Sequence, residues 1–225
     1  MTTEKHDVIT LDGPAGSGKS TIAKRIAKRL GYAFLDTGAM YRAATWWALY
    51  QGVDMDNAEA LVASTQAISL EMEERSEGLY VGVDGHDVSQ AIRTLEVTNA
   101  IKKLDGIAGV RAKMVELQQY IGTQQPTVAD GRDMGTVVFP NARCKFFMDA
   151  SLEERTRRRS EELKSKGIQF DAKSLKQDIH VRDENDRNRS IAPLRPAEGA
   201  HIIDTSAMNL DEVEAQVLAI IEASL

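Results

Sequence analysis

The chain has 225 residues, of which 42% are hydrophobic and 28% charged, an ordinary balance for a globular protein. Its formal net charge of −6 argues against a protein that coats nucleic acid through bulk positive charge. No apolar run is long enough to cross a bilayer, and residues 1–8 lack the apolar segment of a signal peptide. The single cysteine, Cys144, excludes an internal disulfide. We therefore expect a cytoplasmic protein with no membrane or nucleic-acid partner.

The first fifty residues predict a strand–helix–strand unit followed by another helix. Residues 8–11 form a short, apolar, β-branched run that is typical of a buried strand. Ile22, Ile26 and Leu30 then recur at helical spacing before Gly31, and residues 32–35 predict a second strand. Residues 40–50 predict the next helix. This order indicates a parallel sheet.

The middle of the chain follows a different pattern. Apolar residues alternate between residues 68 and 88, and Asp84-Gly85 is a hairpin turn signal. This pattern predicts a small antiparallel sheet inserted into an α/β core. Residues 99–119 then predict a return to helix.

The last hundred residues return to alternating strands and helices. Strands are predicted over 127–129, 144–148 and 200–203, and a helix over 173–187. Ser151 to Glu154 reads as a capping box that starts a helix ending near Gly167, and Asn209 with Glu212 starts the closing helix. The whole pattern predicts an α/β fold with a parallel sheet flanked by helices.

A glycine-rich turn lies between the first strand and the first helix. Residues 13–20, GPAGSGKS, follow the pattern Gly-x-x-x-x-Gly-Lys-Ser, the phosphate-binding loop or P-loop. Glycines let several backbone N–H groups point at one anion, and the following helix adds its N-terminal partial charge. Lys19 is expected to reach the β- and γ-phosphates, and Ser20 to ligate Mg²⁺. A purely structural turn is the alternative, but the strand before and the helix after the loop favour ATP or GTP with Mg²⁺.

Clustered arginines indicate a second binding site, for the molecule that would accept a phosphoryl group. Eight of the 16 arginines fall between residues 155 and 195, which suggests a small polyanionic ligand. Three polar stretches, residues 36–42, 130–136 and 182–189, follow strands or end helices. The carboxyl ends of parallel strands line the ligand crevice of such folds. The absence of an Asn-Lys-x-Asp motif disfavours a GTPase switch.

Five signatures give the sequence its resemblance to the bacterial cytidylate kinases, within the nucleoside monophosphate kinase superfamily. They are GPAGSGKST, LDTGAMYR, DVSQAIRTLEV, ADGRDMGTVVFP and RDENDRNRSIAPL, in order over nearly the whole chain. The resemblance implies a P-loop kinase core with a five-stranded parallel sheet over residues 1–36, 125–150 and 196–225. It also implies a monophosphate-binding domain over 37–124, with the antiparallel insert at about 68–104, and a lid over 151–195. The implied reaction is phosphorylation of CMP and dCMP by ATP.

The resemblance assigns roles to the acceptor residues. The phosphate of CMP is expected to bind Arg42, Arg132, Arg189 and Thr37. Asp133 is expected to accept a hydrogen bond from the cytosine amine, and Arg111 to donate to the acceptor atoms of the base. Arg182 and Asp186 contact the sugar hydroxyls, and Tyr41 lines the pocket. At the position where the family often has a serine near the base, this sequence has Lys102. Either the Lys102 side chain points outward, or the residue that corresponds to the family's serine lies one or two positions away. Asp36 is either part of this site or only the cap of the following helix.

The donor side is implied in the same way. ATP is expected to contact the lid arginines Arg155 and Arg159 and the loop residues Gly13, Pro14, Ala15, Gly16, Ser17, Gly18, Lys19, Ser20 and Thr21. Lys19, Arg132, Arg158 and Arg189 are the expected catalytic residues, and Asp130 is expected to position Mg²⁺ through a water. We expect a monomer. The alternatives are a P-loop kinase for UMP, AMP or a small metabolite such as shikimate, and a non-catalytic nucleotide-binding module.

Overall fold

The computed structural model describes residues 7–165 and 167–224. Residues 1–6, 166 and 225, which belong to the predicted core and lid ranges, lie outside the described part. The chain separates into two compact units: Met1–Phe34 with Gly122–Leu225, called the core unit, and Leu35–Ile121, called the second unit. No helix in the described ranges combines the length and the apolar character needed to span a membrane.

A five-stranded sheet with the order β2-β6-β1-β7-β8 runs through the centre of the core unit. Parallel pairing places Val8 opposite Thr127, Ile9 opposite Cys144, and Phe146 opposite His201. The predicted parallel sheet is therefore confirmed, with each strand a residue or two from its expected bounds. The strands are β1 (Val8–Asp12), β2 (Ala33–Asp36), β6 (Thr127–Gly131), β7 (Cys144–Asp149) and β8 (His201–Asp204).

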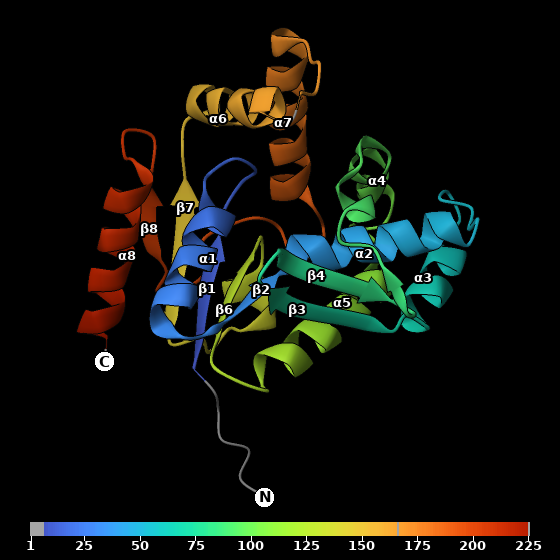
Figure 1. The fold of residues 1–225 in the computed structure, drawn as a ribbon, viewed down its shortest axis with the longest axis horizontal. Coiled ribbons are helices and arrows are strands. Elements are labelled where there is room, and N and C mark those ends of the chain that lie inside the picture. Colours follow the sequence, from blue (N-terminus) through green and yellow to red (C-terminus); the bar gives the residue numbers. More distant parts are fainter. Residues whose placement is uncertain (1–6, 166, 225) are drawn as a thin grey trace, which may run out of the picture. The chain divides into compact units, whose positions relative to one another are not determined.

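Two helices, α1 (Lys19–Leu30) and α8 (Leu210–Ala223), cover part of this sheet (Figure 1). Their apolar faces join the strands in one buried cluster that includes Ile22, Ile26, Val213 and Val217. Each such side chain contributes about 1.5–3 kcal/mol when fully buried. The predicted capping box of α8 is confirmed, because Asn209 accepts from Glu212 N–H and Glu212 accepts from Asn209 N–H.

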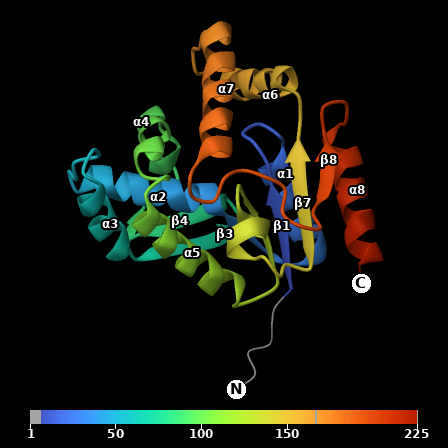
Figure 2. The ribbon, with the colours of Figure 1, turned by 180° about the vertical axis from the view of Figure 1, so that it is seen from behind.

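The core unit also carries a pair of contacting helices, α6 (Leu152–Ser165) and α7 (Ala172–Asn188), seen in Figure 1 and from behind in Figure 2. Only half of the predicted capping box of α6 forms. Ser151 Oγ accepts from Glu154 N–H at 3.2 Å, but the Ser151 N–H donates to Ser206 Oγ at 2.8 Å. The Glu154 carboxylate accepts instead from Arg157 and Arg158, which hold its pKa down at about 2. The second hydrogen bond of the capping box is therefore missing because these arginines occupy the Glu154 carboxylate in place of the Ser151 N–H.

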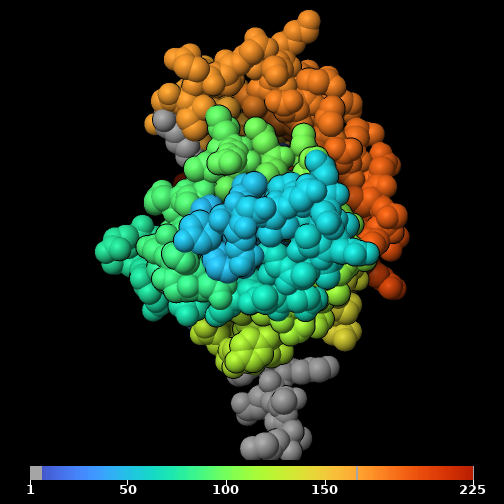
Figure 3. All heavy atoms as spheres, turned by 90° about the vertical axis from the view of Figure 1, so that its right-hand side faces the viewer, coloured from blue at the N-terminus to red at the C-terminus, as the bar shows by residue number. Residues whose placement is uncertain are grey.

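The second unit contains the predicted small antiparallel sheet, in the order β3-β4-β5. Asp84 and Gly85 have φ of 47° and 79° and connect β4 to β5, which confirms the predicted turn. Figure 3 looks onto the atoms of this unit, coloured from blue to light green. Its elements are α2 (Thr37–Tyr50), α3 (Ala58–Gln66), β3 (Leu70–Arg75), β4 (Gly78–Val83), β5 (His86–Asp87), η1 (Ala91–Arg93), α4 (Leu95–Ala100), η2 (Ile101–Lys103) and α5 (Ala108–Gly122).

Two features of the second unit differ from the sequence prediction. Helix α3 was not predicted; Asn57 caps it by accepting from Ala60 N–H at 3.1 Å. The helix predicted over 99–119 is instead broken into α4, η2 and α5, with residues 104–107 outside regular helix. Leu104 is fully buried there, so packing of this side chain overrides the continuous helical pattern.

Candidate active site

The glycine turn lies between β1 and α1, as predicted, and its geometry requires glycine. Gly13 has φ of 154°, and a Cβ at this position would lie 2.0 Å from the Met148 carbonyl oxygen. Gly18 has φ of 88° and immediately precedes α1. The turn therefore brings backbone N–H groups and the positive end of α1 to one place, which suits a phosphate chain.

Lys19 is buried at the first position of α1, with 6% of its surface exposed. Its Nζ donates to the Pro14 carbonyl oxygen at 3.1 Å, so the lysine lies back along the turn. Burial, helped by the positive charge of Arg132, lowers the pKa of Lys19 to about 7, although Asp130 opposes the shift. An anion bound at the turn would offset this unfavourable environment.

Ser20 and Asp130 bring two oxygen-bearing side chains together beside the P-loop. The Ser20 hydroxyl donates to Asp130 Oδ2, which joins the start of α1 to the end of β6. Asp130 is buried, with 3% exposure. A hydroxyl and a carboxylate are hard oxygen ligands, so these residues fit Mg²⁺ together with nucleotide phosphates.

A second charged group of the core unit joins the end of β6 to α7. Arg132 Nε donates to Asp186 Oδ2 at 2.8 Å, and Arg189 Nη1 lies 3.9 Å from Asp186 Oδ1. Burial acts to raise the pKa of Asp186, but the charges of Arg132, Arg182 and Arg189 outweigh it and lower the pKa. The buried Nε of Arg189 has no hydrogen-bond partner among the described residues. Asp133, beside Arg132, is also buried.

The three lid arginines are placed differently from one another. Arg155 is buried, donates to the carbonyl oxygens of Ala150 (2.9 Å) and Ala15 (3.2 Å), and pairs with Asp183. Arg155 therefore holds the P-loop backbone against α6 and α7, and its role as an ATP ligand stays a prediction.

Arg158 and Arg159 lie one helical turn further along α6. Arg158 donates to the Ser17 carbonyl oxygen at 3.3 Å and to both oxygens of Thr205. It therefore ties the P-loop to the end of β8. Arg159 pairs with Glu162 at 2.6 Å on the partly exposed face of α6, away from these contacts. Neither arrangement tests the predicted roles in catalysis and ATP binding.

The remaining predicted residues gather in the second unit, at the start of α2 and on α5. Asp36 caps α2 by accepting from Ala39 N–H at 2.7 Å, and Arg42 Nη2 lies 3.5 Å from Asp36 Oδ2. Thr37, in the first turn, is buried. Arg42 Nε is buried without a hydrogen-bond partner among the described residues.

Arg111 and Tyr41 lie together in the same unit. Arg111 is 4% exposed, its Nη1 donates to the Asp105 carbonyl oxygen at 3.0 Å, and its guanidinium lies 5.6 Å from the Tyr41 ring centre. Lys102 lies in η2 and is exposed, which matches the outward alternative considered for it. The two units thus each carry one set of the predicted site residues.

Comparison with known proteins identifies the family. A sequence model of the family described as cytidylate kinase matches residues 9–223. The chain belongs to the cytidylate kinase family. It is accordingly a phosphotransferase with a P-loop kinase fold, as the sequence signatures predicted.

Individual cytidylate kinases match over nearly their whole length. The cytidylate kinase of Aeromonas salmonicida is 43% identical over 218 residues, which cover 97% of this chain and 95% of the relative. That of Exiguobacterium is 45% identical over 214 residues, 95% of this chain and 96% of the relative. Among solved structures, an uncharacterized protein from Eubacterium ventriosum aligns with a TM-score of 0.53 and 11% identity, over 97% of this chain and 99% of that one. This last likeness concerns the fold alone.

One charged residue of this kinase was missed by the sequence analysis. Asp12, the last residue of β1, is 2% exposed, and its carboxylate accepts backbone N–H groups from Met134 and Gly135. The signal was present: an aspartate ends an apolar strand directly before the glycine turn. The sequence did not show which N–H groups it would meet.

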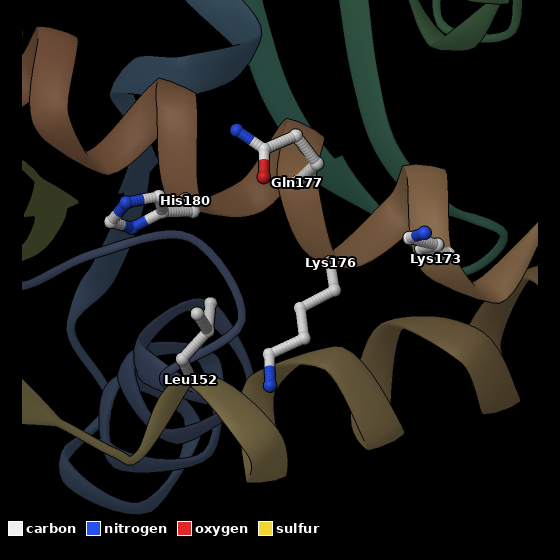
Figure 4. Close-up of a pocket in the computed structure, with 5 residues that line it drawn as sticks. All are labelled: Leu152, Lys173, Lys176, Gln177 and His180. Atoms are coloured by element: carbon white, nitrogen blue, oxygen red, sulfur yellow. The ribbon is translucent and has the colours of Figure 1, made fainter.

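The kinase has a cavity of about 300 Å³ between α6 and α7. Leu152 lines it from α6, and Lys173, Lys176, Gln177 and His180 line it from α7 (Figure 4). Lys176 extends toward α6 and pairs with Glu153 at 2.7 Å. No predicted site residue lines this cavity, so it adds nothing to the assigned chemistry.

Proposed function

We propose that this protein transfers the γ-phosphoryl group of ATP to CMP and dCMP, using Mg²⁺. The observation that carries the proposal is the P-loop: Gly13 has a backbone conformation that requires glycine, and Lys19 is buried at the start of α1, where the positive charge of Arg132, an expected acceptor residue, also acts on it. Lys19 and Arg132 therefore repel each other in the unliganded protein. Cations crowded in this way are stable beside the combined negative charge of a nucleoside triphosphate and a monophosphate.

On the donor side, the proposal uses residues 13–21 as the phosphate cradle. Backbone N–H groups of the turn hold the β-phosphate, and Lys19 turns from the Pro14 carbonyl oxygen to the β- and γ-phosphates. Ser20 would ligate Mg²⁺ and Asp130 would position the ion through a water; when bound, Mg²⁺ neutralises charge on the phosphate oxygens. Arg155 and Arg158 keep the carbonyl oxygens of Ala15 and Ser17 in place.

On the acceptor side, arginines take the phosphate of CMP. In the second unit this is Arg42, assisted by Thr37, and in the core unit Arg132 and Arg189. The buried, unpartnered Nε atoms of Arg42 and Arg189 support this role, because a phosphate oxygen would satisfy each donor. The other nitrogens of these guanidinium groups do have acceptors, Asp36 for Arg42 and the Ala192 carbonyl oxygen for Arg189, so among the described residues only the Nε donors are left for an anionic ligand.

The remaining predicted residues bind the base and sugar of CMP. Asp133 accepts from the cytosine amine, and Arg111, held beside Tyr41, donates to the base acceptors. Asp186 and Arg182 contact the sugar hydroxyls. The lowered pKa of Asp186 supports its part, since an ionised carboxylate accepts from a hydroxyl more strongly than a protonated one.

No general base is required, because the attacking oxygen belongs to a phosphate that is already ionised. The residues align two anions, neutralise charge on the transferred group and exclude water, which would otherwise hydrolyse ATP. Helices α6 and α7 are the proposed lid, with Arg158 and Arg159 facing the transferred phosphate when it closes.

The experiment is a measurement of ADP production from Mg-ATP with CMP, dCMP, UMP, AMP, GMP and shikimate. Strong turnover of CMP and dCMP, much weaker with UMP, is expected, and Asp133→Asn should reduce this preference. Turnover with another acceptor alone would overturn the assignment of the base, and ADP formation that no acceptor increases would favour the nucleotide-binding module. We also propose that the protein is a monomer, which sedimentation tests, and that it is cytoplasmic, which cell fractionation tests.

A further inference from the structure

Asp12 makes a pair of hydrogen bonds that join two loops of the core unit. Its Oδ1 accepts from Met134 N–H at 2.9 Å and its Oδ2 from Gly135 N–H at 2.8 Å. Asp12 directly precedes Gly13 of the P-loop, whereas Met134 and Gly135 directly follow Arg132 and Asp133. One carboxylate thus spans the donor loop and the loop that carries two expected acceptor residues.

These bonds replace the usual helix cap. Residues Met134–Val138 form η3, one turn of π-helix, whose first N–H groups have no partner within the turn. Asp133 stands at the capping position, but its side chain makes no capping hydrogen bond. Asp12 supplies the cap from a different strand, so the Asp133 carboxylate is not required for it.

The backbone on both sides of Arg132 and Asp133 is therefore held by Asp12. Before them, Gly131 is paired with Asp12 in the parallel register of β1 and β6. After them, the first two N–H groups of η3 bind the Asp12 carboxylate. Two residues between two such attachments have little freedom to move relative to the P-loop.

We propose that Asp12 is a positioning residue: its carboxylate sets Arg132 and Asp133 against the P-loop and so controls recognition of the acceptor base. This inference rests on the proposed function for the roles of those two residues. The charged groups that act on Asp12 are Asp133, which repels its negative charge, and Lys19, which attracts it. Asp12 reaches neither substrate directly in this scheme.

The first test compares Asp12→Asn with the wild-type protein. An amide can accept only one of the two N–H groups and presents its own donor to the other. We expect kcat/KM for CMP to fall roughly tenfold, since one charge-assisted bond is lost. KM for ATP should stay within about twofold, because Arg155 and Arg158 hold the P-loop independently.

Base discrimination separates positioning from a general loss of stability. The ratio of kcat/KM for CMP to that for UMP should fall in Asp12→Asn, because only cytosine offers an amine to Asp133. The matched control is Asn209→Ala, which removes a cap that also accepts two backbone N–H groups but lies at the start of α8. It should lower thermal stability and leave the ratio unchanged. An unchanged ratio in Asp12→Asn would overturn the inference, whatever happens to its stability.

A second measurement is independent of activity and of the variant's folding. The amide proton shifts of Met134 and Gly135 in wild-type protein should titrate together near pH 6, because burial raises the pKa of Asp12 to about 6. Only one amide titrating, or neither titrating at any pH at which the protein stays folded, would overturn the inference even if CMP is the substrate. Joint titration in a protein that fails to phosphorylate CMP would refute the proposed function while leaving Asp12 as the link between the two loops.

Discussion

The buried charge of Asp12 leads to a prediction about stability. Burial, opposed by the two backbone N–H groups, raises the pKa of Asp12 to about 6 in the folded protein, whereas the pKa of this carboxyl group in the unfolded chain is about 4. Between these values the folded protein binds a proton that the unfolded chain does not. The resulting stabilisation is complete below about pH 4 and is lost as pH rises through about 6.

The size of this effect follows from the two pKa values. At about pH 5 the proton stabilises the wild-type fold by about 1.4 kcal/mol relative to about pH 8. Asp12→Asn lacks the titrating group. The difference in free energy of unfolding, wild type minus variant, should therefore be about 1.4 kcal/mol more positive at about pH 5 than at about pH 8.

The assay is urea unfolding followed by circular dichroism at both pH values. Tryptophan fluorescence is unsuitable, because both tryptophans, Trp46 and Trp47, lie in the second unit and Asp12 lies in the core unit. Asn209→Ala provides the baseline, and its difference from wild type should not change with pH. A difference for Asp12→Asn that is constant with pH, or that changes in the opposite direction, would refute the reasoning.

Three further substitutions test the site. Gly13→Ala should abolish ATP binding, measured by calorimetry, because its Cβ would lie 2.0 Å from the Met148 carbonyl oxygen; normal affinity would contradict the described turn. Asp183→Asn should lower the free energy of unfolding by about 3–5 kcal/mol, since it leaves Arg155 buried without its partner; an unchanged melting temperature would count against this ion pair. Arg189→Ala should lower turnover far more than ATP affinity, and unchanged turnover would remove Arg189 from the site.

Much of the fold could be predicted because local pattern and tertiary structure agree. The strands of the core sheet are short apolar runs, and Asp84-Gly85 adopts the positive φ values its sequence favours. The P-loop was predictable for the same reason, since its glycines lie between a strand and a helix. Burial along α8 follows helical spacing only in part: Val213, Val217 and Ile221 are buried, whereas Leu210 is 42% exposed.

The remaining features depend on partners that are distant in sequence. Ser151 and Glu154 have the spacing of a capping box, yet Glu154 binds arginines on its own helix. Arginine is a residue type that commonly binds phosphate, and the sequence could not show that Arg155 pairs with Asp183 on another helix. Spacing shows which residues could meet, and only the packed structure determines which contact has the lower free energy.

The missed residue, Asp12, also indicates how this site differs from an ordinary core. Lys19 has a lowered pKa and Asp12 a raised one, so burial disfavours the charged form of both side chains. A core selected for stability alone would replace such groups with apolar ones. Their presence at the end of β1 and the start of α1 is explained if a bound polyanion restores the charge on Lys19 and if Asp12 fixes the loop that meets the acceptor. The structure then tolerates a less stable unliganded state in order to hold two negatively charged substrates in register.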